Sequence, residues 1–292
     1  MRSGVVGFLP SHPREITPEL AALLRSHGFT GVTVIVPDPL EARREEYERA
    51  GKILRDGDVT VAQANPRYEV LVHPDDGQRA LGIRQLQAAC RCASWLQAQT
   101  TYVRPGSLNP KGPWQPHPEN TRLGTLLRLV DSLRQVVGAA EESGIPLAIE
   151  GASTSPLDTP ERVRDVIEAV GSPALRFNAD PVNFVRSLDE LYDTTSLTHR
   201  LFDCCGRYTV CAHAKDITYD NWLPVRMSEC LLGEGLQDQG AFLQRFEQCC
   251  PDGFVLIEHL PDDKIPAAKR NLDLAVERAG LRWRGGDEAR GR

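Results

Sequence analysis

The stretch GFVLIEHL, residues 253 to 260, decides the fold, because an apolar run ends there in a single carboxylate, Glu258. Three earlier runs have the same form: PLAIEGA (146 to 152) with Glu150, LRFNADPVN (175 to 183) with Asp180, and YTVCAHAKD (208 to 216) with His213. The four polar residues lie 30, 33 and 45 residues apart, and each interval has room for one strand, one helix and their loops. Strands that are apolar throughout are typical of a parallel sheet covered by helices on both faces.

We therefore expect an α/β chain that forms a single (β/α)8 TIM barrel, in which the carboxyl ends of successive strands meet at one mouth. Three carboxylates and one imidazole would converge there, and like charges in a partly dry pocket resist ionisation unless a cation offsets them. The pattern predicts one divalent metal ion, held by Glu150, Asp180, His213 and Glu258. Oxygen and nitrogen ligands without thiolate suit Mn²⁺, Mg²⁺, Co²⁺ or Zn²⁺ and do not choose among them.

Apolar runs and amphipathic segments alternate along the whole chain. The expected strands are 4 to 10, 31 to 37, 59 to 66, 100 to 106 and the four runs that end near Glu150, Asp180, His213 and Glu258. The expected helices are 17 to 28, 41 to 57, 75 to 97, 119 to 143, a helix from 159, 188 to 204, 238 to 249 and 263 to 280. Such regular alternation indicates one closed barrel over residues 1 to 282. Residues 283 to 292 are expected to form a disordered tail.

The lengths of the predicted loops indicate which end of the barrel carries the function. Helix-to-strand connections are short, as in HGFT and ESGIP, whereas strand-to-helix connections are long, as in PGSLNPKGPWQPHPEN and DITYDNWLPVRMSECLLGEG. The additional length falls at the mouth, where substrate-binding loops of such barrels lie.

Composition narrows the class of ligand and the compartment. The chain has 292 residues, a formal net charge of −6 and a pI near 5.7, which disfavours binding to nucleic acid and favours a small-molecule substrate. The first apolar stretch is about seven residues long, too short for a signal-peptide core or a membrane span. The eight cysteines form no CxxC pair, so we expect free thiols and a cytoplasmic location. The sequence leaves open whether the protein forms a homo-oligomer.

The sequence resembles the xylose-isomerase-like TIM-barrel superfamily of sugar isomerases, epimerases and related endonuclease-fold proteins. The resemblance extends over residues 1 to 282 and is carried by IE at 149 to 150, NADPVN, HAKD, GEG at 233 to 235, and LIEH. It implies that Glu150, Asp180, His213 and Glu258 hold one metal ion. It also implies that Glu150 and Glu258 are the catalytic acid and base, exchanging a proton next to a carbonyl through an enediolate.

The sequence departs from many of these epimerases at one position, where Asn183 replaces the histidine of an Asp-x-x-His motif. An amide can bind a substrate hydroxyl but cannot shuttle a proton, so isomerase, epimerase and dehydratase chemistry all stay open. Lys215 shares a strand face with His213 and is expected to bind a substrate oxygen or to pair with Asp180 or Glu258. Asp216 is expected to bond nearby backbone amides, and GEG to form a turn.

Further candidates lie in the long loops and beside the last ligand. Arg104 is expected to engage a substrate carboxylate or phosphate, with a structural role as the alternative. Trp114, and Tyr219 with Trp222, are expected either to line a sugar-binding wall or to pack for stability. His259 follows Glu258 and is expected on the opposite strand face, in contact with the core or a helix.

The leading interpretation is a divalent-metal-dependent sugar or keto-acid isomerase or epimerase. A metal-dependent dehydratase, which is a lyase, of an inosose-like or dehydroshikimate-like substrate is the first alternative, and a non-catalytic ligand-binding barrel is the second. An abasic-site endonuclease is disfavoured, because the resemblance would then imply three zinc ions and several more histidines at strand ends. The chain has seven histidines, of which only His213 is well placed for that role, and it is acidic.

Overall fold

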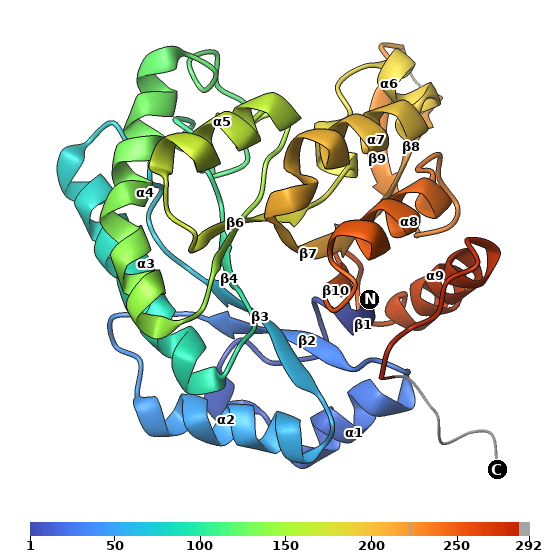
Figure 1. The fold of residues 1–292 in the computed structure, drawn as a ribbon, viewed down its shortest axis with the longest axis horizontal. Helices are drawn as coiled ribbons and strands as arrows, with labels where there is room; N and C mark the ends of the chain where they lie inside the picture. The colour runs from blue at the N-terminus through green and yellow to red at the C-terminus, as the bar shows by residue number, and fades with distance from the viewer. Residues whose placement is uncertain (222, 286–292) are drawn as a thin grey trace.

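The computed structural model describes residues 1 to 221 and 223 to 285 and shows one closed barrel of parallel strands (Figure 1). Around the barrel, the order is β1, β2, β3, β4, β5, β6, β7 and β10, and β10 pairs with β1 to close it. These strands are β1 (Arg2–Val5), β2 (Gly31–Val36), β3 (Thr60–Pro66), β4 (Thr101–Val103), β5 (Leu147–Ile149), β6 (Leu175–Ala179), β7 (Thr209–Ala214) and β10 (Phe254–Ile257). The predicted (β/α)8 fold is confirmed.

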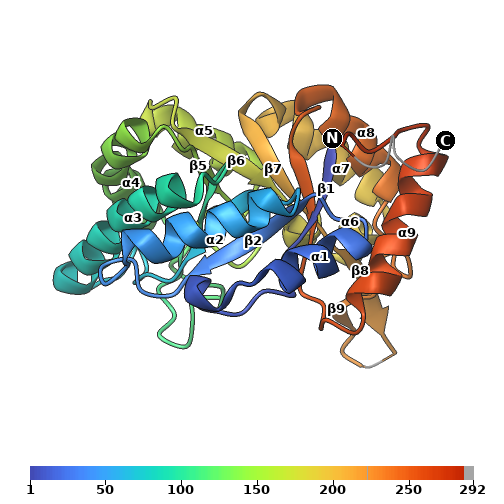
Figure 2. The same ribbon diagram turned by 90° about the horizontal axis from the view of Figure 1, so that it is seen from below.

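The helices surround the barrel and bury their apolar faces against it (Figures 1 and 2). They are α1 (Pro18–Ser26), α2 (Arg44–Asp56), α3 (Asp76–Leu96), α4 (Leu123–Ser143), α5 (Pro160–Val170), α6 (Leu188–Tyr192), α7 (Thr194–Cys205), α8 (Gln239–Cys249) and α9 (Ile265–Arg278). In α4 the buried residues include Leu129, Leu133, Val136 and Ala140, which recur at the three- and four-residue spacing of one helix face. No helix in the described part of the chain is both long enough and apolar enough to cross a membrane.

Local sequence signals account for several helix ends. Thr159 accepts a hydrogen bond from the amide of Arg162, and Pro160 occupies the first turn of α5, as the TPER sequence predicts. The single helix predicted at 188 to 204 is wrong, because Asp193 caps a second helix within it and separates α6 from α7. Its carboxylate accepts a hydrogen bond from the amide of Ser196. Short polar caps therefore divide an amphipathic segment that periodicity alone joins.

The first strand also differs from its predicted range of 4 to 10. It ends at Val5, because Gly7 and Phe8 have positive φ angles of 150° and 62°, which turn the chain out of the sheet. At the other end of the chain, Trp283 donates a hydrogen bond to Asp273, and Arg284 pairs with Glu247 and Asp252. Residues 286 to 292 of the expected tail lie outside the described residues, so its disorder stays a prediction.

An antiparallel hairpin that sequence reasoning did not predict follows β7. Its strands are β8 (Asp216–Asp220) and β9 (Arg226–Cys230), and Figure 2 shows it projecting from the barrel beyond the helices. The carboxylate of Asp216 accepts hydrogen bonds at its base from the amides of Ile217, Gly233, Gly235 and Gln237. The structural role expected for Asp216 is therefore confirmed, and Gly235 lets the backbone approach this carboxylate closely, because a Cβ atom there would lie 2.2 Å from Oδ1.

Candidate metal centre and active site

The four predicted ligands meet at the carboxyl ends of neighbouring strands. Glu150, Asp180 and Glu258 directly follow β5, β6 and β10, and His213 lies near the end of β7. One ligand atom from each of the four lies within 4.8 Å of those of the others. All four side chains are buried, Glu258 being the most accessible with 7% of its surface exposed. Residues as far apart in the sequence as Glu150 and Glu258 therefore form one cluster that could hold a metal ion.

The hydrogen bonding of this cluster fits a cation. Asp180 Oδ2, His213 Nδ1 and Glu258 Oε2 are buried and make no hydrogen bond of acceptable geometry with any described residue. His213 Nδ1 nevertheless lies 2.9 Å from Glu150 Oε1 and 3.0 Å from Glu258 Oε2. Buried polar atoms that make no hydrogen bond are rare in folded proteins, and here three converge, although the Lys215 ammonium lies within ion-pair distance of the two carboxylate oxygens. A divalent ion would satisfy them together, and carboxylate oxygens with one imidazole nitrogen form a suitable ligand set.

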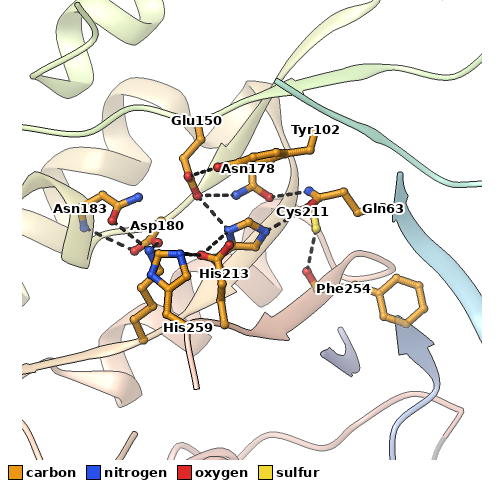
Figure 3. A network of polar contacts seen from close by, with 12 residues as sticks. Gln63, Tyr102, Glu150, Asn178, Asp180, Asn183, Cys211, His213, Phe254 and His259 are labelled. Atoms are coloured by element: carbon orange, nitrogen blue, oxygen red, sulfur yellow. Dashed lines mark hydrogen bonds and ion pairs between the residues drawn. The ribbon is translucent and has the colours of Figure 1, made fainter. Parts of the chain in front are cut away.

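Two buried amides orient the imidazole (Figure 3). His213 Nε2 lies 3.2 Å from Gln63 Oε1, Gln63 Nε2 donates to Asn178 Oδ1 at 3.2 Å, and Asn178 Nδ2 donates to Glu150 Oε1 at 2.9 Å. Since the nitrogen of Gln63 is occupied by Asn178, its oxygen must accept the proton of His213 Nε2. Loss of the Nδ1 proton would then leave a lone pair facing the carboxylates, as a metal ligand requires.

Sequence reasoning missed Gln63 and Asn178. Each is fully buried within a strand, Gln63 in VAQAN and Asn178 in LRFNA, and an amide inside an apolar strand requires a hydrogen-bonding partner. The free-energy cost of burying an amide without a hydrogen bond is the signal that could have identified both residues. It does not reveal which residue across the barrel supplies the partner.

The two glutamates have different surroundings. Glu150 accepts hydrogen bonds from neutral donors, the phenol of Tyr102 and the amide of Asn178. Burial and the neighbouring Glu150 raise the pKa of Tyr102 well above its ordinary value, so its hydroxyl stays a donor. Burial alone would raise the pKa of Glu258, but the charges of His213 and Lys215 outweigh burial and hold it well below its ordinary value. Glu258 is therefore held ionised.

The other two members of the cluster respond to the same charges. Burial raises the pKa of Asp180 to about 6, although Lys215 acts in the opposite direction. Burial would lower the pKa of His213, but Glu258 and Glu150 outweigh it and raise that pKa to about 10. In the metal-free protein, a proton on His213 therefore compensates part of the carboxylate charge, and metal binding must release it.

The ammonium group of Lys215 is surrounded by oxygen atoms. Its ammonium nitrogen lies 3.0 Å from Asp180 Oδ2 and 3.1 Å from Glu258 Oε2, and it donates to Asn183 Oδ1 at 3.0 Å. A fourth oxygen, from Glu229, lies 3.6 Å away. The pairing predicted as one role of Lys215 is thus confirmed, and the residue also contributes to the cavity wall.

A cavity of about 290 Å³ opens above the cluster. Glu150 is the member of the four-residue cluster that lines it, together with the predicted substrate-binding residues Asn183, Lys215 and Trp114. Arg104 is not among the described residues that line it, because its guanidinium lies over the ring of Tyr68, 4.5 Å from the centroid. Tyr219 is likewise absent from the described lining, and Trp222 lies outside the described residues.

The position predicted for His259 is wrong. Alternation of strand faces holds only while the chain is extended, but β10 ends at Ile257, and His259 has a φ of 60° in the left-handed region. This backbone turns the ring toward the cavity, where Nδ1 lies 3.0 Å from both carboxylate oxygens of Glu229. His259 and Glu229, which comes from β9, form a second polar pair at the rim.

Known structures share this fold over nearly the whole chain at low sequence identity. A D-tagatose 3-epimerase-like protein has a TM-score of 0.73 and 16% identity, with 96% of this chain and 98% of that one covered. A xylose isomerase-like TIM barrel protein of Mycobacterium smegmatis, in complex with magnesium, has a TM-score of 0.71 and 15% identity over 95% and 96% of the two chains. The probable 3-DHS dehydratase AsbF of Bacillus anthracis has a TM-score of 0.68 and 16% identity over 93% and 98%.

A search of curated protein sequences finds no match. The family model described as xylose isomerase-like TIM barrel matches residues 21 to 278, which include all four predicted ligands and every strand of the barrel except β1. This agrees with the resemblance carried by the strand-end motifs. The chain therefore belongs to the xylose isomerase-like TIM barrel family.

Proposed function

We propose that this protein is a divalent-metal-dependent isomerase or epimerase, which moves a proton at the carbon next to the carbonyl of a sugar or keto acid. The observation that carries the proposal is the convergence of Glu150, Asp180, His213 and Glu258 beside a cavity of about 290 Å³, with three buried ligand atoms that make no hydrogen bond to the described residues. The names of similar structures, an epimerase-like protein and a magnesium complex, agree with it.

The residues of the chain would divide the work of a proton shift. When bound, the metal ion would supply the positive charge that stabilises an oxyanion beside the reacting carbon. Glu150 and Glu258 come from strands that are not neighbours in the barrel, and they would exchange the proton as acid and base. Tyr102 and Asn178 hold Glu150 by hydrogen bonds, and Lys215 keeps Glu258 ionised. Asn183 and Trp114 line the cavity and would position the substrate.

A dehydratase is the second candidate, since removal of a proton next to a carbonyl can also end in loss of hydroxide. The similarity to a probable 3-DHS dehydratase favours keeping this candidate. Product mass separates the two activities, because a lyase product is lighter by one water and an isomerase product is unchanged. Metal analysis of the purified protein tests the third candidate, a ligand-binding barrel without turnover.

Deuterium incorporation is the decisive assay. The protein, supplied with Mn²⁺ in D₂O, would be incubated with ketoses, hydroxypyruvate and cyclic polyols, and solvent exchange would be followed by NMR. Glu150→Gln and Glu258→Gln should each abolish exchange, whereas Glu142→Gln, at an exposed position on α4, should retain it. Undiminished exchange in both active-site variants would contradict the two-glutamate mechanism. The cytoplasmic location and a homo-oligomer stay predictions from the sequence.

A further inference from the structure

Glu229 is the carboxylate of the cavity wall that belongs to the hairpin rather than to the barrel. It lies on β9, and its side chain is 40% exposed at the rim. Its oxygens lie 3.0 Å from His259 Nδ1, and Oε1 lies 3.6 Å from the ammonium of Lys215. It therefore contacts both basic residues among the described residues that line the cavity.

The charges of the site do not balance. Its described part holds four carboxylates, Glu150, Asp180, Glu229 and Glu258, and one ammonium, Lys215, which pairs with the last three; Glu150, Glu229 and Lys215 line the cavity. A divalent ion would offset two of the three excess negative charges and leave one, with both imidazoles neutral. The Glu229 carboxylate lies 3.0 Å from His259 Nδ1, so a positive charge on this imidazole would already face a carboxylate of the chain.

A substrate phosphate or carboxylate would therefore find, in the described cavity wall, no basic side chain that is not already paired with a carboxylate. Lys215 is shared among Asp180, Glu229 and Glu258, and Arg104 lies over Tyr68, outside the lining. An anion placed here would meet like charge in a partly desolvated site, which is a strong means of rejecting a ligand.

Uncharged hydroxyl groups face no such penalty. The cavity wall offers them the hydroxyl of Ser228, the amide of Asn183 and the carboxylate of Glu229, all able to hydrogen-bond a polyol. Trp114 supplies an apolar face, which suits the C–H surface of a sugar. The volume of about 290 Å³ lies at the lower end of small-molecule pockets, about 300 to 1,000 Å³, and suits a single monosaccharide.

We propose that this cavity selects uncharged polyhydroxy carbonyl compounds over phosphorylated or carboxylated ones, and that Glu229 is the residue that sets the preference. The inference rests on the proposed function, and within it favours an unphosphorylated sugar over a keto acid or a dehydroshikimate-like acid. Glu229 acts in two ways: it adds a negative charge at the rim, and it occupies the basic groups that would otherwise attract an anion.

Binding of unreactive polyols tests the preference without turnover. D-glucitol and D-glucitol 6-phosphate, which have no carbonyl, would be titrated by calorimetry into protein saturated with Mg²⁺. The wild type should bind glucitol at least about tenfold more tightly than its phosphate ester, the size of one screened charge interaction. Glu229→Gln should tighten binding of the phosphate ester about tenfold, whereas Glu234→Gln, which removes an exposed carboxylate outside the cavity wall, should leave the ratio unchanged.

The wild type supplies a second measurement, independent of how well the variant folds. Added sodium chloride should narrow the difference between the two ligands, because salt screens partly exposed charges. Phosphate ester binding as tight as that of glucitol, absence of glucitol binding, or an unchanged ratio in folded Glu229→Gln would overturn the inference. Selective glucitol binding without deuterium exchange into any ketose would instead refute the proposed function and leave this selectivity in place.

Discussion

Replacement of Gln63 by methionine should weaken Mn²⁺ binding by roughly 10- to 100-fold, the range typical of residues that orient a metal ligand. Methionine keeps the approximate shape of the side chain but removes both 3.2 Å hydrogen bonds, to His213 Nε2 and to Asn178 Oδ1. The imidazole then loses the contact that fixes its Nδ1 toward the carboxylates. Asn178, which holds Glu150, also loses its partner.

The same substitution should reduce the free energy of unfolding. It leaves one buried donor and one buried acceptor without a partner, at about 1 to 3 kcal/mol each, so the loss should be roughly 2 to 6 kcal/mol. Metal affinity would be measured by calorimetry, and stability by urea unfolding of the metal-free protein. Thr33→Val is the matched control, because Thr33 pairs with Gln63 in the β2–β3 register and its buried hydroxyl has no hydrogen-bond partner among the described residues.

Metal affinity and stability, measured together, distinguish a loss of His213 orientation from a general loss of stability. Thr33→Val should leave Mn²⁺ affinity unchanged and should not lower stability, since it removes an unpaired hydroxyl. A Gln63→Met protein that binds Mn²⁺ within twofold of the wild type would refute the reasoning, even if its stability falls. The imidazole would then be oriented without the amide chain.

Two further predictions concern stability. The Arg200 guanidinium, hydrogen-bonded to Glu161 at 2.7 and 2.8 Å, lowers the pKa of that carboxyl from 4.5 to about 2. The contribution of this pair to the stability of the fold is therefore fully present above about pH 4.5 and is lost as the pH falls toward 2. Because the pair is partly exposed, Glu161→Gln should cost about 1 kcal/mol or less at pH 7. In urea unfolding the difference from the wild type should shrink as the pH falls from about 4.5 to about 2, and a difference independent of pH would contradict this. Gly235→Ala should destabilise the base of the hairpin by about 1 to 3 kcal/mol, because a Cβ atom there would lie 2.2 Å from Asp216 Oδ1. Gly138→Ala, with open space around it in α4, should stabilise by about 0.5 to 1 kcal/mol in the same assay, and equal effects at the two glycines would exclude the steric explanation.

The barrel and its four ligands could be predicted because both depend on local patterns. An apolar run long enough for one strand, followed by a polar residue, recurs at Glu150, Asp180 and Glu258, and closure of the barrel brings the strand ends together whatever the loops do. The four ligands lie at the same end of the barrel because all its strands run in one direction, and the alternation of strands and helices in the sequence already implies that direction.

The features that were missed depend on contacts between distant segments or on single backbone angles. Gln63 and Asn178 meet across the barrel, and no spacing in the sequence records that approach. The left-handed backbone of His259 reverses the expected side-chain direction at one residue. The guanidinium of Arg104 packs on the ring of Tyr68, and this contact depends on the conformation of a loop, which strand periodicity does not predict.

The central claim is that one divalent ion binds between the ends of four strands. Anomalous diffraction from crystals soaked in Mn²⁺ tests it most directly. The account predicts one strong peak about 2.0 to 2.2 Å from ligand atoms of Glu150, Asp180, His213 and Glu258. A fully soaked crystal with no peak among these four side chains, or with its peak elsewhere on the protein, would contradict it.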